Sequence, residues 1–190
     1  LPSGRMSLQI FEQRYLDLVA YCMRESEGFG VVWLQQGSEV SGGSLDTPNV
    51  GEYGTYARIV DWDQLPNGLL GITIEGHEPF GVQSVWREPS GLVKAEVEWR
   101  YIPETMQLPD RHASLAEVLE GLLRHPQIQR LQLDSDLTDG WRVGAQLAQL
   151  LPIDEGLKYQ LQGLTSVEQL LEEMDNILVE LSGESGQTGR

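Results

Sequence analysis

The pattern of apolar and polar residues predicts a β-rich first part and a helical second part. Between residues 11 and 25, apolar side chains recur at helical spacing with charged residues between them, which predicts an amphipathic helix ending before Gly28. The apolar run from Phe29 to Leu34 predicts a strand covered on both faces. The stretch 36–51 is rich in Gly, Ser, Asp and Pro, which predicts an exposed loop.

Further strands are expected in close succession after this loop. They span 53–62, 69–75, 80–88 and 92–100, with turn signals at 66–68 and 76–79. In the last of these strands, four residues alternate with charged ones and predict one buried and one solvated face: Val93, Ala95, Val97 and Trp99. Because no helix separates these strands, they predict a mostly antiparallel small barrel or curled sheet.

The pattern becomes helical after residues 103–109. Two capping boxes, at 114–117 and 165–168, predict where the first and last helices begin. Helices are also expected over 139–151 and 154–161, and the acidic segment 134–140 departs from calcium-loop spacing and predicts a helix cap instead. We therefore predict an α+β chain with a β-rich part (1–103), a helical part (104–182) and a disordered tail (183–190).

The net charge of the chain disfavours one class of binding partner, nucleic acids. Thirteen Lys and Arg residues face 29 Asp and Glu residues, for a formal net charge of −16. A field of this sign repels phosphate backbones, so nucleic-acid binding is disfavoured. No apolar run approaches the ~20 residues that cross a bilayer and no signal peptide is evident, so we expect a cytoplasmic protein without membrane segments. The first residue is not Met, so we expect further sequence before Leu1.

Side chains that could run a reaction are sparse. No G-x-x-x-x-G-K-[ST] phosphate loop is present, and both lysines, Lys94 and Lys158, are expected on solvated surfaces that do not suit a Ser–Lys dyad. The single cysteine, Cys22, excludes an internal disulfide and a cysteine-based zinc site, and its helical position predicts burial. The histidines are expected at the surface: His77, His112 and His125. We therefore expect no cofactor, no metal site and no enzymatic activity.

Several short motifs resemble those of one protein family. Leu8-x-Ile-Phe-Glu-x-Arg-Tyr15, Gly54-Thr-x-Ala-x-Ile59 and Leu151-Pro-Ile153 resemble motifs of the amino-terminal substrate-binding domain of Lon proteases and its stand-alone bacterial relatives. The chain resembles this family over residues 1–181, with Pro79 where the family usually has Arg. The resemblance implies a PUA-like β-barrel followed by a helical bundle. It also implies a non-catalytic domain that recognises polypeptide and lacks the ATPase and protease domains of Lon.

The residues that carry the resemblance are expected to be structural. They are Ile10, Phe11, Glu12, Arg14, Tyr15, Gly54 and Thr55. We expect Ile10, Phe11 and Tyr15 in the core because of their helical spacing. Glu12 and Arg14 are too close in sequence to face each other on a helix, so we expect them to bind neighbouring loop amides and carboxylates.

Contacts with an unfolded chain are expected from exposed aromatic side chains, which offer a large contact area at low entropic cost. The candidates are Trp33, Trp62, Trp86 and Tyr101, and burial in the core is the alternative for each of them. The expected partners are unfolded or hydrophobic polypeptide segments, while a partner protease or ATPase and a weak homodimer stay open. Two alternative functions also stay open: RNA binding through a PUA-like barrel, and small-molecule binding.

Overall fold

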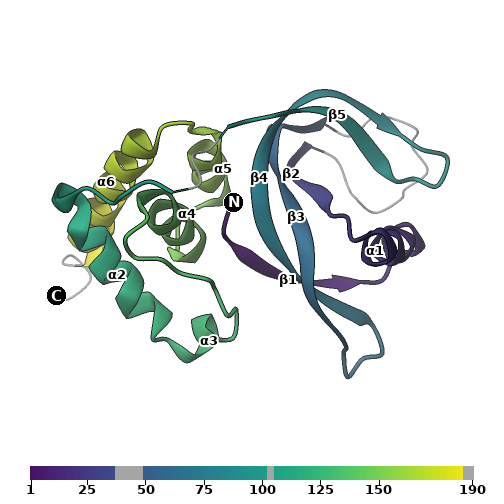
Figure 1. The fold of residues 1–190 in the computed structure, drawn as a ribbon, viewed down its shortest axis with the longest axis horizontal. Coiled ribbons are helices and arrows are strands. Elements are labelled where there is room, and N and C mark those ends of the chain that lie inside the picture. The colour runs from purple at the N-terminus through teal and green to yellow at the C-terminus, as the bar shows by residue number, and fades with distance from the viewer. Residues whose placement is uncertain (37–48, 102–104, 186–190) are drawn as a thin grey trace. The chain divides into compact units, whose positions relative to one another are not determined.

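The computed structural model describes residues 1–36, 49–101 and 105–185 and divides the chain into two compact units (Figure 1). The first unit spans Leu1–Ile102 and the second spans Pro103–Arg190, so the boundary falls one residue before the one expected from sequence. The first unit is a curled antiparallel sheet with one helix and the second is a set of helices. The predicted α+β class is therefore confirmed.

The described residues of the first unit form five strands and one helix. In chain order these are β1 (Arg5–Ile10), α1 (Gln13–Glu25), β2 (Phe29–Gln36), β3 (Asn49–Gln64), β4 (Leu70–Arg87) and β5 (Val93–Trp99). All strand pairs are antiparallel, in the order β1-β4-β3-β2, with β5 also paired to β4. Because β1 pairs with the first half of β4 and β5 with its second half, the long strand β4 joins both parts of the sheet.

One of the two predicted turns in this sheet is correct and the other is wrong. Gly68 has φ +81° and its amide donates to the Leu65 carbonyl, forming the turn between β3 and β4. At 76–79 the chain instead continues as part of β4. Gly76 exchanges backbone hydrogen bonds with the amino-terminal segment, donating to Gly4 and accepting from Ser3, and a register shift opposite β3 absorbs the irregularity.

The core of the first unit lies between α1 and one face of the sheet. Buried residues from β1, α1, β3 and β4 form this cluster: Ile10, Val19, Ala57, Ile72 and Ile74. Burying such a side chain contributes roughly 1.5–3 kcal/mol, so α1 is held mainly by its apolar face. Cys22 is fully buried on this helix, as predicted.

The second unit is built around a buried helix. Its elements are the 3-10 helix η1 (Asp110–His112), then α2 (Ala113–Leu123), α3 (Pro126–Gln129), α4 (Gly140–Leu150), α5 (Glu155–Gly163) and α6 (Val167–Ser185). Helix α4 is buried along most of its length, and α2 and α6 pack on it through apolar side chains: Leu115, Leu119, Val143, Leu147, Leu171 and Met174. No helix among the described residues is long and apolar enough to cross a membrane.

Only some of the helix starts predicted from the sequence are correct in this unit. Asp139 caps α4 by accepting from the amides of Trp141 and Arg142, as predicted. The capping box at 114–117 is wrong, because the chain enters α2 earlier through η1. At the last helix, Ser166 rather than Thr165 accepts from the Gln169 amide. Helix α6 extends to Ser185, past the start of the expected tail, and residues 186–190 lie outside the described part of the chain.

Candidate functional site

One row of residues crosses four strands, and its side chains lie on a single face of the first unit's sheet. The strand register places Val32 of β2 opposite Gly54 of β3, Gly54 opposite Phe80 of β4, and Phe80 opposite Trp99 of β5. Directly opposed residues on neighbouring strands point to the same face. We call these four residues, together with Tyr56, the aromatic row.

Gly54 lets the side chains on either side of it meet across the sheet. A Cβ atom at this position would lie 2.6 Å from Cγ1 of Val32 and 2.7 Å from Cζ of Phe80. It would also lie 2.5 Å from the Val31 carbonyl oxygen, which belongs to the backbone and cannot move aside easily. The glycine of the family motif is therefore required by packing, which supports the structural role expected for it.

Trp99 is held at the exposed end of the aromatic row. Its ring meets Phe80 edge-on, with 6.2 Å between ring centroids, and meets Tyr56 edge-on at 5.7 Å. Phe80 is buried, yet 58% of Trp99 remains exposed to solvent. Edge-to-face contacts fix the orientation of an indole ring, so this ring loses little freedom when a ligand covers it.

Charged and polar groups flank the row at Tyr56. The Tyr56 hydroxyl accepts from the Gly28 amide at 2.6 Å and donates to the Glu27 carboxylate at 3.4 Å. The guanidinium of Arg58 lies 5.9 Å from the Tyr56 ring centroid. The aromatic surface therefore carries one acidic and one basic neighbour beside its apolar rings.

The sequence pattern missed Trp99 because it predicted that face of β5 to be buried. Val93 and Val97 are half-buried, but Ala95 and Trp99 are exposed. The reason is that β5 pairs only with β4 among the described strands, so its outer side is not covered by a neighbouring strand. Alternation reports which residues share a face and does not report how well that face is covered.

The four predicted contact residues are all exposed, so burial in the core is wrong for each of them. Tyr101 is 83% exposed and follows Trp99 by two positions, and Trp33 directly follows Val32 on β2. Trp62 lies opposite Ile72 and Trp86 lies opposite Lys94, near opposite ends of β4. Tyr101 and Trp33 adjoin the aromatic row in sequence, near Trp99 and Val32, whereas the register sets Trp62 and Trp86 far apart along β4.

The other signature residues divide between core and surface. Ile10 and Thr55 are buried and Tyr15 packs against the core, as expected. Phe11 is 62% exposed, so the expectation of burial is wrong. It lies in the connection between β1 and α1, where helical spacing does not determine the direction of a side chain.

Glu12 and Arg14 also differ from expectation, because they face each other. Arg14 donates through Nε and Nη2 to the two carboxylate oxygens of Glu12 at 3.0 and 3.2 Å. This contact is possible because Glu12 is the extended N-cap residue of α1 and lies outside the helix. The remaining terminal nitrogen of Arg14 donates to the Gly91 carbonyl at 2.8 Å, which is a loop contact of the expected kind.

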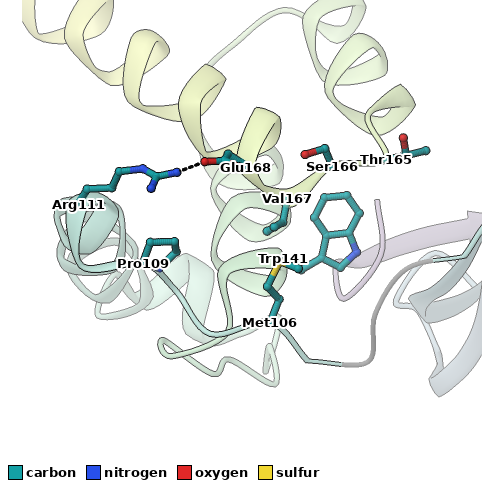
Figure 2. Close-up of a pocket in the computed structure, with 8 residues that line it drawn as sticks. All are labelled: Met106, Pro109, Arg111, Trp141, Thr165, Ser166, Val167 and Glu168. Carbon is teal, nitrogen blue, oxygen red and sulfur yellow. Dashed lines mark hydrogen bonds and ion pairs between the residues drawn. The ribbon is translucent and has the colours of Figure 1, made fainter.

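A cavity in the second unit is a separate candidate (Figure 2). It has a volume of about 470 Å³, is open to solvent on one side and lies at the starts of α4 and α6, lined by Met106, Pro109, Arg111, Trp141, Thr165, Ser166, Val167 and Glu168. Arg111 forms an ion pair with Glu168 at its rim. The volume falls within the range of about 300–1,000 Å³ that is usual for small-molecule pockets.

Behind this rim, the structure corrects the prediction for one histidine. His112 is only 3% exposed; it accepts from Arg111 Nε at 3.0 Å, and its Nδ1 lies 2.5 Å from an Asp175 oxygen. His125 is exposed and His77 is half-buried. Arg111 therefore contacts Glu168 directly and Asp175 through the His112 imidazole. Both carboxylates belong to α6, so these contacts orient η1 against that helix.

The cysteine and the two lysines lie in environments that do not activate them as nucleophiles. Burial raises the pKa of the Cys22 thiol, and the Glu27 carboxylate raises it further, so the thiolate is disfavoured. Lys94 and Lys158 form ion pairs with Glu88 and Glu155. Within the part of the chain that the structure describes, no three His, Cys, Asp or Glu residues are grouped so that they could hold a metal ion.

A curled antiparallel sheet with one packed helix, followed by a helical unit, is the architecture of Lon amino-terminal domains. The family described as the ATP-dependent protease La (LON) substrate-binding domain matches residues 1–180, and the chain belongs to this family. A Lon N-terminal domain protein from Xanthomonas campestris is 33% identical, with a TM-score of 0.73, and the match covers 92% of this chain and 89% of that one.

A more distant structure shows the same fold. The N-terminal domain of Lon protease from the Mycobacterium avium complex is 14% identical, with a TM-score of 0.59, over 93% of this chain and 90% of that one. A search of curated proteins finds no match. The predicted family is thus confirmed by the family match and by a structural relative at 33% identity.

Proposed function

We propose that this chain is a non-catalytic recognition domain for unfolded or hydrophobic polypeptide segments, with the aromatic row as its main contact surface. The observation that carries the proposal is Trp99, an indole ring fixed by Tyr56 and Phe80 and left largely exposed. Interfaces gain most of their binding energy from a few such aromatic anchors. Membership of a substrate-binding family supports polypeptide as the class of ligand.

The earlier candidate contacts fit around this anchor. Tyr101 and Trp33 are exposed and lie close in sequence to Trp99 and Val32 of the row, so we propose that they extend the contact surface. Trp62 and Trp86 would contact only longer segments, because they lie away from the row along the strands. Any cleavage of a bound segment would require a partner protease or ATPase, and the net charge of −16 disfavours RNA as the ligand.

The test is fluorescence anisotropy of a labelled, permanently unfolded polypeptide titrated with the protein, with a labelled RNA of equal length in parallel. We expect saturable binding of the polypeptide and no binding of the RNA. Trp99→Ala should weaken polypeptide binding by about thirtyfold or more, since removing a central aromatic anchor costs about 2 kcal/mol or more. Trp62→Ala is the matched control, because Trp62 is also 58% exposed and lies outside the row.

Each outcome has a clear meaning for the proposal. Equal losses in the two variants would show that any exposed tryptophan contributes, and the row would lose its special role. Absence of polypeptide binding by the unaltered protein would contradict the proposed function. Binding of RNA alone, weakening steeply with salt, would favour the alternative function of a PUA-like RNA-binding module.

A second candidate function, small-molecule binding, is favoured by the cavity of about 470 Å³ in the helical unit. A ligand that binds only the native state raises the melting temperature. We would screen a metabolite panel by thermal shift and repeat each hit with Val167→Trp, which fills the cavity from its α6 side. A shift that disappears in this variant would place the ligand there, and a panel without shifts would leave polypeptide recognition as the function.

A further inference from the structure

The outer edge of β5 carries backbone groups that no other described strand uses. On its inner edge, β5 pairs with β4, and the ends of this ladder are marked by hydrogen bonds from Glu88 N to Leu92 O and from Arg100 N to Pro79 O. Hydrogen bonding alternates along an antiparallel pair, so the even-numbered residues between these ends face β4. The N–H and C=O groups of the odd-numbered residues therefore point outward: Val93, Ala95, Val97 and Trp99.

We propose that this edge binds an extended segment of an unfolded polypeptide as an additional strand of the sheet. The proposal rests on the proposed function and specifies how the client is held. Every unfolded segment offers main-chain donors and acceptors, so strand addition supplies affinity without requiring a particular sequence. The edge ends at Trp99, which places the aromatic row next to the incoming strand.

The side chains on the two faces of β5 indicate which side chains a bound segment should carry. On one face, Val97 and Trp99 would lie beside the client's side chains and favour apolar residues. On the other face, Glu96 and Glu98 are exposed and carry negative charge, although each accepts one neutral hydrogen bond, from Ser84 and Gln83 respectively. Lys94 lies on the same face, but its charge is paired with Glu88 of the same hairpin. A segment in which apolar and basic residues alternate is therefore the best complement.

The same carboxylates disfavour a second copy of this chain at the edge. Antiparallel pairing of two β5 strands centred on Val97 would set Glu96 of each copy opposite Glu98 of the other, and like charges on adjacent strands are destabilising. Charged residues on an exposed edge strand commonly prevent self-association in this way. The two carboxylates therefore favour a cationic polypeptide over a second copy paired in that register.

The other open edges of the sheet are less suited to a client. The pairing of β2 with β3 shifts register around Trp33 and again before Gln36, and such irregularities interrupt a continuous row of backbone groups. In β1, Ile10 belongs to the buried core and Leu8 packs against it, so one face of this strand is already occupied. Among the described strands, β5 combines regular outward groups with an exposed aromatic anchor.

The first test uses a labelled synthetic peptide, matched to β5 in length, in which leucine and lysine alternate. Two further versions carry N-methyl groups on alternate residues, one version in each phase, so that each removes one set of backbone donors. We expect one phase to lose binding by about tenfold or more and the other to bind within about threefold of the parent peptide. Equal effects of the two phases would overturn strand addition.

The second test changes the protein at Ala95, whose N–H points outward and whose side chain is exposed. Ala95→Pro removes this donor without breaking the β4 ladder, because proline is tolerated on edge strands where the N–H faces solvent. We expect it to weaken binding of the leucine–lysine peptide by about tenfold or more, while the matched control Ala95→Val binds normally. Circular dichroism of both variants checks that the fold is retained.

The possible results separate this inference from the function on which it rests. If Ala95→Pro binds like the unaltered protein, the edge is not the site, and polypeptide recognition through the aromatic row still stands. If the unaltered protein binds no unfolded polypeptide, the proposed function itself fails. If sedimentation shows a dimer that Ala95→Pro abolishes, and the peptide does not bind, the edge belongs to a second copy and the inference is overturned.

Discussion

Arg14 donates from its side chain to the backbone carbonyl of Gly91 at 2.8 Å, linking two residues that are 77 positions apart in the chain. The guanidinium is almost completely buried, and its other contacts hold both carboxylate oxygens of Glu12. Gly91 lies in the turn between β4 and β5, and Arg87 also donates to its carbonyl. The start of α1 is thereby attached to the hairpin that ends in Trp99.

We expect Arg14→Lys to destabilise the first unit. A lysine has no forked group that can hold two carboxylate oxygens and a carbonyl together, so the buried Glu12 contact would be only partly replaced. The loss should be about 1–3 kcal/mol in the free energy of unfolding, measured by urea denaturation. Arg24→Ala is the control, because the Arg24–Glu25 pair is exposed and should change stability by less than ~0.5 kcal/mol.

The sequence predicted those parts of this region that depend on local periodicity. The span of α1, the β2 strand and the turn at Gly68 follow from spacing and turn chemistry within short windows. The Arg14–Gly91 contact and the continuity of β4 through Gly76 depend on segments distant in sequence. The exposure of Phe11 and Trp99 depends on what covers them, and no pattern within a single strand or helix reports that.

We expect Gly54→Ala to disrupt the packing of the aromatic row and to destabilise the first unit. The added Cβ would clash with the Val31 carbonyl, Val32 and Phe80, and relieving three contacts at once requires the strands to move apart. The expected cost is about 2–4 kcal/mol in the free energy of unfolding. The control is Gly121→Ala on α2, where no atom lies within 4 Å of the new Cβ, and a gain of up to ~1 kcal/mol is expected from helix propensity.

We expect Cys22 to react slowly in the native protein. Burial first, and the Glu27 carboxylate second, raise the pKa of its thiol, so little thiolate forms near neutral pH. Iodoacetamide labelling followed by mass spectrometry should be much slower in the folded protein than in guanidinium chloride. Rapid native labelling would show that the helix opens readily at this position.

The raised pKa of Cys22 also predicts how stability depends on pH. A thiol whose pKa is higher in the folded state contributes its full stabilisation below the pKa of the unfolded chain, about 8.5. That contribution is lost as the pH rises above this value toward the folded pKa. The difference in unfolding free energy between the unaltered protein and Cys22→Ala should therefore decrease between neutral and alkaline pH, and a constant difference would contradict the assignment.

In the helical unit, sequence reasoning located the elements better than it located the polar contacts. The spans of α4 and α5 and their caps at Asp139 and Asp154 follow from short-range rules. The first capping box failed because the 3-10 helix before α2 already supplies a helical entry. His112 was expected at the surface from its turn-forming neighbours, whereas its partner Asp175 is 63 positions later and has no local signal.

We expect removal of His112 to loosen the packing of η1 and α2 against α6. In His112→Ala, Arg111 loses one of its two acceptors, Asp175 loses its contact with the imidazole, and a small cavity replaces the ring. The cost should be about 1–3 kcal/mol, which follows from leaving polar groups unsatisfied and from the lost packing. Hydrogen exchange of α2 and α6 amides measures this cost within the helical unit, because the two units of the chain need not unfold together.

The control is His125→Ala, which removes an exposed side chain and one long hydrogen bond of 3.3 Å from the Gln127 amide. Equal exchange in the two variants would show that the His112 contacts do not hold the helices together.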